Sequence, residues 1–225
     1  MSLALLLWHL LTAGIPAQTV GPLPGMPPIL DPSDIYAADH SGRMSPAVEG
    51  FPPRVYVPNT ESNTVSVIDP VPYTVIDTLK VGRLPQHVTP SYDLTTLWVL
   101  NDRDNSLTEI NPATGQTGRV LPVDDPYNMY YTPDGQYAIV VAEQRERLMF
   151  RDAKTMALKH ALWVPCKGVD HLDFSADGRY LIASCEFGKS LIKVDVATEK
   201  LVGILKLGPR TMPQDVKLSP DGQVF

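Results

Sequence analysis

Residues 54–70 read RVYVPNTESNTVSVIDP, and this stretch decides the fold. Apolar and polar residues alternate over residues 54–59, a polar turn follows, and the alternation resumes up to Asp69 and Pro70. Such alternation is the pattern of a half-buried strand, and a short polar insert between two such runs is typical of a hairpin. The stretch therefore predicts two antiparallel strands.

The same pattern recurs three times along the chain, as LWVLNDRDNSLTEIN, YAIVVAEQRERLMFRD and YLIASCEFGKSLIKVD. Asp-Gly turns that begin at Thr132, Ser175 and Ser219 repeat every 43 or 44 residues. A period of about 40 to 45 residues with four short strands per repeat is typical of a β-propeller. We therefore predict an all-β fold of four four-stranded blades, in which each blade covers the apolar face of its neighbour.

The run Val55-Tyr56-Val57-Pro58-Asn59, followed by the strand that ends at Asp69, resembles the YVTN-type β-propeller repeat. The later copies carry the SPDG-type turn of that family, and the resemblance extends over residues 54–225. It implies the YncE-like group of exported bacterial propellers. Similar blades occur in lactonases, in the haem-carrying domain of dissimilatory nitrite reductase and in some quinoprotein dehydrogenases. The resemblance therefore implies a scaffold and leaves the activity open.

The repeat pattern starts on the second strand of a blade and stops at Phe225, just after a turn. Members of the family that these repeats resemble usually have seven blades, so we expect the chain to form the N-terminal part of a seven-bladed ring. A closed ring of four blades, with residues 215–219 completing the first blade, is the alternative. An open ring would leave apolar blade faces bare, which predicts self-association.

The chain divides into three predicted segments: a signal peptide at 1–17, a Pro-rich segment at 18–53, and the propeller at 54–225 with repeats at 54–96, 97–136, 137–179 and 180–225. The apolar run from Leu3 to Gly14 is too short to span a bilayer and is typical of a signal-peptide core, with Ala17 as the cleavage position. We therefore expect a periplasmic, secreted or cell-surface protein; a buried strand or helix is the alternative for this run. The Pro-rich segment either wraps across the propeller or tethers it to the membrane.

Charge and cysteine content restrict the partners and the compartment. The net charge is -6, from 19 basic and 25 acidic side chains, and no basic stripe is present, which argues against nucleic acid as a partner. The two cysteines, Cys166 and Cys185, suit an oxidising compartment and flank a predicted hairpin. A disulfide between them and two buried free thiols both remain open.

The candidate ligand site lies where the loops that enter the innermost strands converge, at one mouth of the central channel. Four residues occupy equivalent positions there, spaced 41, 43 and 44 residues apart: His87, Asn128, His171 and Asp215. Gln86, Asp170 and Gln214 each precede one of them. We expect these side chains to form an arc around the mouth.

The preferred functional prediction is a non-catalytic binding or scaffold module for a small molecule, a peptide or a partner protein. The alternative is an enzyme domain of lactonase or oxidoreductase type, haem- or quinoprotein-like, that uses His87 and His171. These two histidines, with Asp170 or Asp215, are also the candidate metal ligands. Without a helical HxxxH-type spacing the histidines are weak candidates. The sequence names no cofactor. Trp98 and Trp163 lie in predicted strands and are expected to pack between blades.

Overall fold

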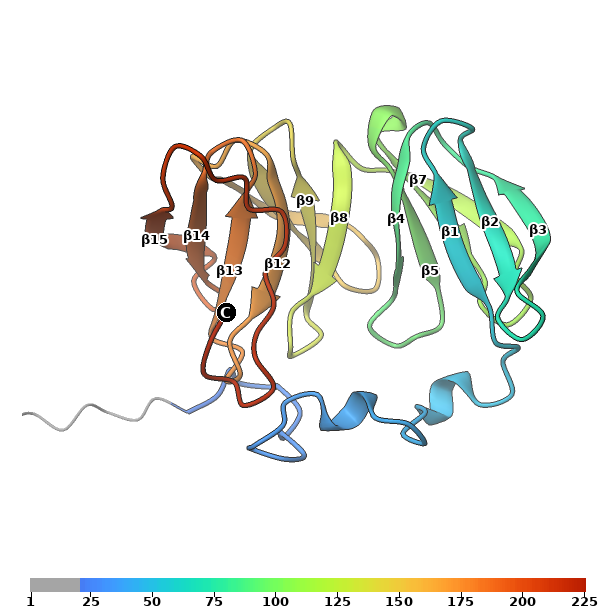
Figure 1. Ribbon diagram of the computed structural model, residues 1–225, viewed down its shortest axis with the longest axis horizontal. Helices are drawn as coiled ribbons and strands as arrows, with labels where there is room; N and C mark the ends of the chain where they lie inside the picture. The colour runs from blue at the N-terminus through green and yellow to red at the C-terminus, as the bar shows by residue number, and fades with distance from the viewer. Residues whose placement is uncertain (1–20) are drawn as a thin grey trace, which may run out of the picture.

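The computed structural model describes residues 21–225 and confirms the all-β propeller architecture (Figure 1). The predicted signal peptide lies outside these residues. Within residues 21–225, fifteen strands form four antiparallel sheets, each a simple up-and-down meander. Sheet 1 consists of β1 (Val55–Asn59), β2 (Thr64–Asp69) and β3 (Thr74–Lys80), and sheet 2 of β4 (Pro85–Pro90), β5 (Leu97–Asn101), β6 (Ser106–Ile110) and β7 (Thr117–Pro122). Sheet 3 consists of β8 (Pro126–Tyr131), β9 (Tyr137–Ala142), β10 (Arg147–Asp152) and β11 (Leu158–Trp163), and sheet 4 of β12 (Val169–Phe174), β13 (Tyr180–Cys185), β14 (Ser190–Asp195) and β15 (Lys200–Lys206).

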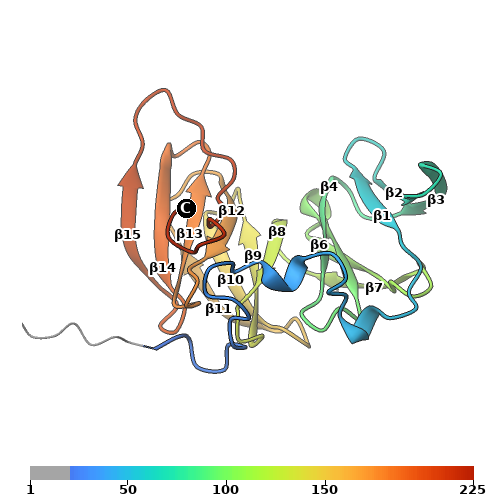
Figure 2. The same cartoon turned by 60° about the horizontal axis from the view of Figure 1, so that its bottom comes forward.

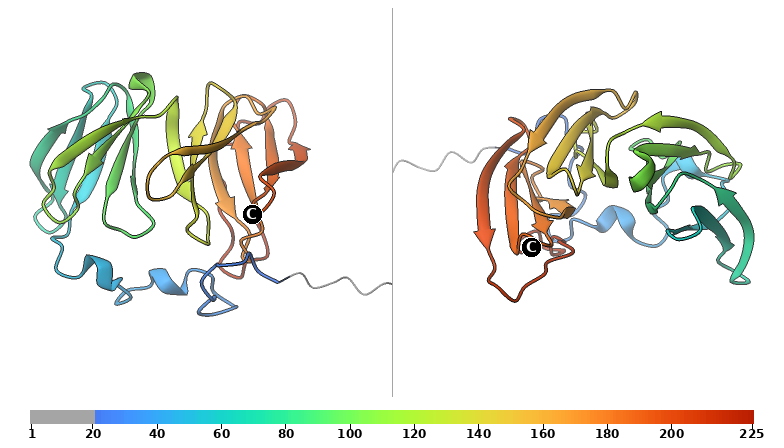
Figure 3. Two further views of the ribbon diagram at one scale, coloured as in Figure 1. Left: turned by 180° about the vertical axis from the view of Figure 1, so that it is seen from behind. Right: turned by 90° about the horizontal axis from the view of Figure 1, so that it is seen from above.

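The four sheets stand side by side in an open arc, which is seen from above in the right panel of Figure 3. The first strands of sheets 2, 3 and 4 line the inner wall, where β4 contacts β8 and β8 contacts β12. Sheet 1 has three strands, because its β1 corresponds to the second strand of the other sheets. Each predicted repeat thus spans three strands of one sheet and the innermost strand of the next.

Local turn chemistry explains the repeat. Within the turn at Thr132 the hydroxyl donates to Asp134 Oδ1 at 2.6 Å, and Gly135 takes a positive φ of 69°. The turns at Ser175 and Ser219 contain the same hydroxyl–carboxylate hydrogen bond, at 2.6 Å in each. Ser91 donates to Asp93 at 2.7 Å in the earlier turn, which lacks the glycine. Each turn therefore forms from its own residues, and in sheets 2, 3 and 4 the first strand is joined to the second in the same way.

Apolar side chains between adjacent sheets form the core. Ile139, Leu148 and Phe150 of sheet 3 are fully buried against sheet 4, in a cluster that also contains Cys166 and Cys185. The sulfur atoms of these two cysteines are bonded, with their Cα atoms 5.0 Å apart. The disulfide connects the segment before β12 to the end of β13, at the same end of sheet 4 as the predicted ligand site.

The Pro-rich segment crosses the opposite end of the molecule (Figures 1 and 2). We call residues 21–53 the N-terminal strap; it contains two short 3-10 helices, η1 (Ala37–Asp39) and η2 (Pro46–Val48). Leu23 N donates to Asp177 O at 2.8 Å, and Ile35 N donates to Pro220 O at 2.8 Å. The strap therefore binds the end of the arc formed by sheet 4, and it enters β1 at the other end.

The four-bladed closed ring is not observed. Residues 215–219 form no strand and do not pair with β1, whose described partner is β2. They run beside β12 instead, where Leu218 N donates to Asp173 Oδ2 at 2.9 Å. A carboxylate, rather than a strand of sheet 1, therefore satisfies this backbone amide.

The prediction for the tryptophans was half right. Trp98 is 2% exposed between sheets 2 and 3, whereas Trp163 is 59% exposed. Trp163 ends β11, the outermost strand of sheet 3, and no strand of residues 21–225 lies on the outer side of β11. Within residues 21–225 we find no helix with the length and apolar character needed to cross a bilayer.

Candidate functional site

Three of the predicted site residues come together on the innermost strands, and we call His87, Asn128 and His171 the inner arc. They lie on β4, β8 and β12, each at a point where pairing with the second strand of the sheet shifts register. A β-bulge of this kind places an extra residue in one strand and re-aims its side chains. The 41- and 43-residue spacing therefore places equivalent side chains at equivalent bulges.

Aromatic rings converge at this point. The ring centroids of His87 and His171 are 5.3 Å apart, although 84 positions separate them in the chain. Tyr127, the bulge residue of β8, lies 5.1 Å from His87 and 5.7 Å from His171. All three contacts are edge-to-face, an arrangement that aromatic pairs favour.

Hydrogen bonds fix the tautomer of each histidine. Asn128 Oδ1 accepts from Met129 N at 2.8 Å, which directs Nδ2 of the same amide to His171 Nδ1 at 3.2 Å. Nδ1 of His171 is therefore an acceptor, and its proton lies on Nε2. His87 Nδ1 lies 2.8 Å from the carbonyl oxygen of Tyr127, which can only accept, so His87 carries its proton on Nδ1 and has a lone pair on Nε2.

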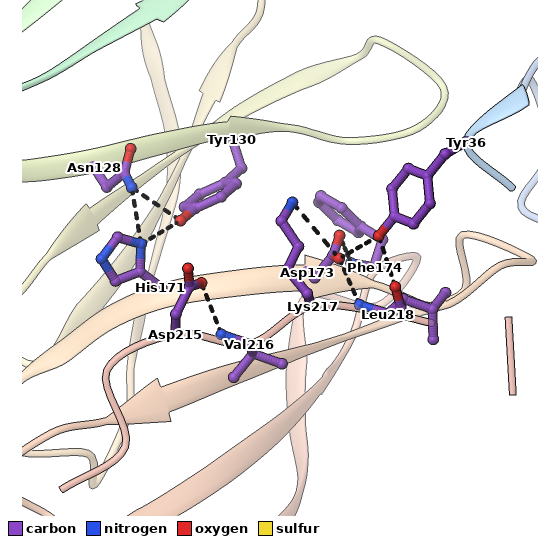
Figure 4. Close-up of polar contacts among 10 residues, drawn as sticks. All are labelled: Tyr36, Asn128, Tyr130, His171, Asp173, Phe174, Asp215, Val216, Lys217 and Leu218. Atoms are coloured by element: carbon purple, nitrogen blue, oxygen red, sulfur yellow. Dashed lines mark hydrogen bonds and ion pairs between the residues drawn. The ribbon is translucent and has the colours of Figure 1, made fainter. Parts of the chain in front are cut away.

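Burial keeps both rings neutral. The pKa of His87 and that of His171 are lowered from the usual 6.5, mainly because burial disfavours the charged imidazolium. The Tyr130 hydroxyl completes the group, at 3.0 Å from His171 Nδ1 and 2.9 Å from Asn128 Nδ2 (Figure 4). The mouth thus contains one uncharged imidazole with an accepting Nε2 and one with a donating Nε2.

The other predicted residues surround this group. Asp215 is exposed, accepts from Val216 N at 2.8 Å, and acts to raise the pKa of His171 (Figure 4). Gln214 donates to Glu186 at 2.9 Å, and Gln86 is half-buried at the bulge of β4. Asp170 is 1% exposed and accepts from Ser184 Oγ at 2.6 Å and from His171 N at 2.8 Å. Asp170 therefore positions the backbone of β12.

Three carboxylates that the sequence analysis missed form a second arc at the same end of the sheets. Asp102, Glu143 and Glu186, which we call the outer arc, each follow the last residue of β5, β9 and β13. Their spacing of 41 and 43 residues equals that of the inner arc. An acidic residue directly after the second strand of three successive repeats was the signal that could have revealed them.

Burial changes the acidity of several groups near the mouth. It is the largest cause that raises the pKa of Asp102 to about 7, and that of Glu143 also to about 7. Burial raises the pKa of Asp170 to about 7 as well, against the hydrogen bonds that lower it. The pKa of Tyr127 is raised to about 12, first by burial and then by the negative charge of Asp170. The surroundings of the mouth therefore disfavour additional negative charge.

At the opposite end, the strap contacts the polar side chains of β12 and the segment beside it (Figure 4). Asp173, two residues after His171 on β12, accepts from Leu218 N, and Lys217 Nζ lies 3.9 Å from the same carboxylate oxygen. Tyr36 of the strap donates to Leu218 O at 2.7 Å. The polar side chains of β12 thus extend from the inner arc to the strap.

Across residues 21–225, no three or more His, Cys, Asp or Glu side chains are grouped so that they could hold a metal ion. Within the inner arc, Asn128 Nδ2 is bonded to His171 Nδ1, while His87 Nδ1 is bonded to the carbonyl oxygen of Tyr127. The arrangement is suited to hydrogen bonding with a bound molecule.

Solved structures with the same fold include proteins of different kinds. A hydrazine synthase from Kuenenia stuttgartiensis matches with a TM-score of 0.67 and 21% identity over 76% of this chain and 50% of its own. A functionally unknown protein from Desulfotomaculum acetoxidans matches with a TM-score of 0.60 and 14% identity over 75% of this chain and 57% of its own. The dihydro-heme d1 dehydrogenase NirN, in complex with DHE, matches with a TM-score of 0.54 and 19% identity over 67% of this chain and 34% of its own.

The chain therefore spans from about a third to just over half of the length of these structures. At such identities the likeness shows the fold alone. No curated protein matches the chain. The profile of the YNCE-like beta-propeller family matches residues 23–159, which is more than half of the sequence, as the YVTN-type repeats predicted. The chain belongs to the YNCE-like β-propeller family.

Proposed function

We propose that this propeller is a binding module that holds a small polar molecule at its channel mouth. The observation that carries the proposal is the convergence of three rings from three neighbouring inner strands. The ring centroids of His87, Tyr127 and His171 lie 5.1 to 5.7 Å from one another. A cluster of aromatic rings with a few fixed polar groups is typical of the lining of a small-molecule site.

Preorganisation supports binding as the role of the mouth. The lone pair on His87 Nε2 accepts a hydrogen bond and the proton on His171 Nε2 donates one, so the pair matches a ligand with both kinds of group. Both tautomers are fixed before a ligand arrives, since their Nδ1 atoms are already bonded to the protein. Affinity then comes from fixed side chains without the cost of ordering them.

We also propose that the protein acts outside the cytoplasm. The apolar run at residues 3–14, the bonded Cys166–Cys185 pair and the family support export. Disulfides persist in oxidising compartments and are rare in the cytosol. Detection of the intact disulfide in protein purified from the periplasm or the culture medium, under conditions that block thiol exchange, would test this placement.

The lactonase- or oxidoreductase-type enzyme stays the alternative. It requires one of the two histidines to act as a general base, and a neutral imidazole is competent for that role. The alternative is tested with a panel of lactones and of redox dyes. Turnover that His171→Ala abolishes in a folded variant would replace the binding proposal with the enzyme.

Histidine-selective NMR on the 225-residue chain tests the binding proposal. A panel containing a sugar, an amino acid, a dicarboxylate and a polyamine is added in turn, and the imidazole signals of His87 and His171 are followed. His40 in the strap, at the far end of the molecule, is the internal control. A saturable shift of the two mouth signals without His40 supports the proposal; no shift with any compound, or an equal shift of His40, overturns it.

A further inference from the structure

The outer arc surrounds the mouth with acidic side chains. The charges that act most strongly on the Tyr127 hydroxyl are those of Asp170, Glu143, Glu186 and Asp102, all of them carboxylates. The charges that raise the pKa of Glu143 are likewise those of acids, Glu186 and Asp125 among them. Clefts lined by one sign of charge concentrate ligands of the opposite sign. The field at Tyr127 therefore attracts cations.

Two buried carboxylates near the mouth each have one oxygen without a hydrogen-bond partner. Asp102 is 4% exposed and Asp170 is 1% exposed, yet Oδ1 of the first and Oδ2 of the second have no hydrogen-bond partner among residues 21–225. Buried polar atoms are nearly always paired, and an unpaired one is costly. A donor brought by a ligand would satisfy such an atom.

Asp102 also lines a pocket of about 330 Å³ between sheets 2 and 3. Asp125, Asn105 and Gln144 share the lining, and Gln144 Nε2 lies 3.5 Å from Asp102 Oδ2. Two arginines complete the lining: Arg103 counteracts the raised pKa of Asp102, and Arg145 donates its backbone N–H to Asp125 Oδ2 at 2.8 Å. The lining of the pocket thus contains two carboxylates, two side-chain amides and two arginines.

We infer that the mouth binds a small linear organic cation with two or more ammonium groups, held by the outer-arc carboxylates over the ring of Tyr127. The inference rests on the proposed function and names the class of ligand. Ammonium groups donate to unpaired carboxylate oxygens and also bind to the face of a tyrosine ring. The lone pair on His87 Nε2 is a further acceptor.

The distribution of the carboxylates favours a polyamine over a metal ion. The outer arc contributes one carboxylate from each of three sheets, and neighbouring sheets pack about 10 Å apart. One metal ion cannot bind carboxylates at such a spacing, in line with the lack of a metal-holding group within residues 21–225. A flexible chain of methylene groups with several charges can reach more than one of them.

Isothermal titration calorimetry with spermidine tests the inference on the 225-residue chain. We expect saturable binding in low salt, weakened about tenfold by Glu143→Gln, because one charge-assisted contact of this kind is lost. Glu49→Gln is the matched control: it makes the same change of charge on the exposed strap, at the opposite end. Equal weakening by both variants would mean attraction to net charge alone and would overturn the inference, as would a lack of binding.

Two further probes separate this inference from the proposed function. If a neutral sugar or citrate shifts the His87 and His171 signals and spermidine does not, the mouth is a binding site but not a cation site. If no probe shifts those signals, both proposals fail. Trilysine is the probe for a basic peptide: binding at least tenfold tighter than that of spermidine would overturn the small polyamine in favour of a peptide.

Discussion

Sheets 3 and 4 place equivalent residues on equivalent faces, yet only one of these faces is covered. Ile139, Leu148 and Phe150 of sheet 3 are fully buried beneath sheet 4. By strand pairing, their counterparts in sheet 4 are Ile182, Leu191 and Lys193, which are half-buried on a face that no described sheet covers. We call these two surfaces the covered face and the bare face.

The comparison shows that sheet 4 has apolar residues on both of its faces. The bare face keeps apolar residues and has a groove of about 420 Å³ lined by Ile182, Leu191, Leu205 and others. The bare face differs from the covered face at the position of Phe150, whose counterpart is Lys193. Lys193 Nζ lies 3.5 Å from the ring centroid of Tyr180, so its charge lies over an aromatic ring at the edge of the groove.

The largest expected difference between the two faces comes from one pair of identical substitutions. Leu148→Ala on the covered face should lower the free energy of unfolding by about 3 kcal/mol, because it leaves a cavity in a packed core. Leu191→Ala on the bare face should cost about 1 kcal/mol, since less apolar surface is buried there. Urea denaturation of the two variants measures both values. Equal losses would mean that the bare face is covered in solution.

Removal of the disulfide affects the other side of sheet 4, which packs on sheet 3. Replacing both Cys166 and Cys185 with Ala removes a bond between residues 19 positions apart and should lower stability by roughly 3 kcal/mol. Because the bond ties β12 to β13, the mouth histidines should also show broader NMR signals in this variant. Unchanged denaturation with and without a reducing agent would contradict the structural role of the bond.

Glu143, at the mouth end between the two sheets, should make stability depend on pH. Its pKa is raised from 4.5 to about 7, so between these values the folded chain holds a proton that the unfolded chain has released. Folding takes up a proton there, and the contribution of this group to the free energy of unfolding falls as the pH rises from about 4.5 to 7. Glu143→Gln should therefore gain stability relative to the wild type across this window.

The difference between the two unfolding curves reports Glu143 together with its coupling to the neighbouring acids, because the shifts of groups that do not interact with Glu143 cancel in it. Glu49→Gln, on the exposed strap, supplies the control. Wild-type and Glu143→Gln stabilities that run parallel from pH 4.5 to 7 would show that this carboxyl is not buried as the structure has it.

The smallest expected effect concerns Lys193. Lys193→Phe gives the bare face the residue that the covered face carries, and it should change stability by about 0.5 kcal/mol or less. Removal of the charge enlarges an exposed apolar surface, so sedimentation velocity should detect stronger self-association. A variant that sediments as the wild type does at every concentration would mean that the bare face is not adhesive.

Sequence reasoning predicted the sheets because their determinants are local. Hydroxyl–carboxylate turns such as Ser175–Asp177 repeat with a fixed period, and strand alternation marks two buried faces. It also placed His87, Asn128 and His171 in one arc, since equal spacing in a repeat means equal positions in space. The period thus predicted both the fold and the direction in which to search for the site.

What the sequence could not supply depends on contacts between distant segments. The bulges of the inner strands decide that Asp170 is buried against Ser184 while His171 enters the mouth, and alternation alone does not separate them. The reach of Tyr36 to Leu218 depends on the path of a strap that has no repeat pattern. Trp163 was misplaced because a strand pattern does not say which strand is outermost.

The central claim is that equivalent bulges bring two neutral histidines of opposite tautomer to one mouth. Long-range ¹⁵N–¹H NMR of the imidazoles at pH 7 tests it directly. We predict a proton on Nδ1 of His87, a proton on Nε2 of His171, and a nuclear Overhauser contact between the two rings. Two rings of the same tautomer, or two rings without contact, would contradict the account.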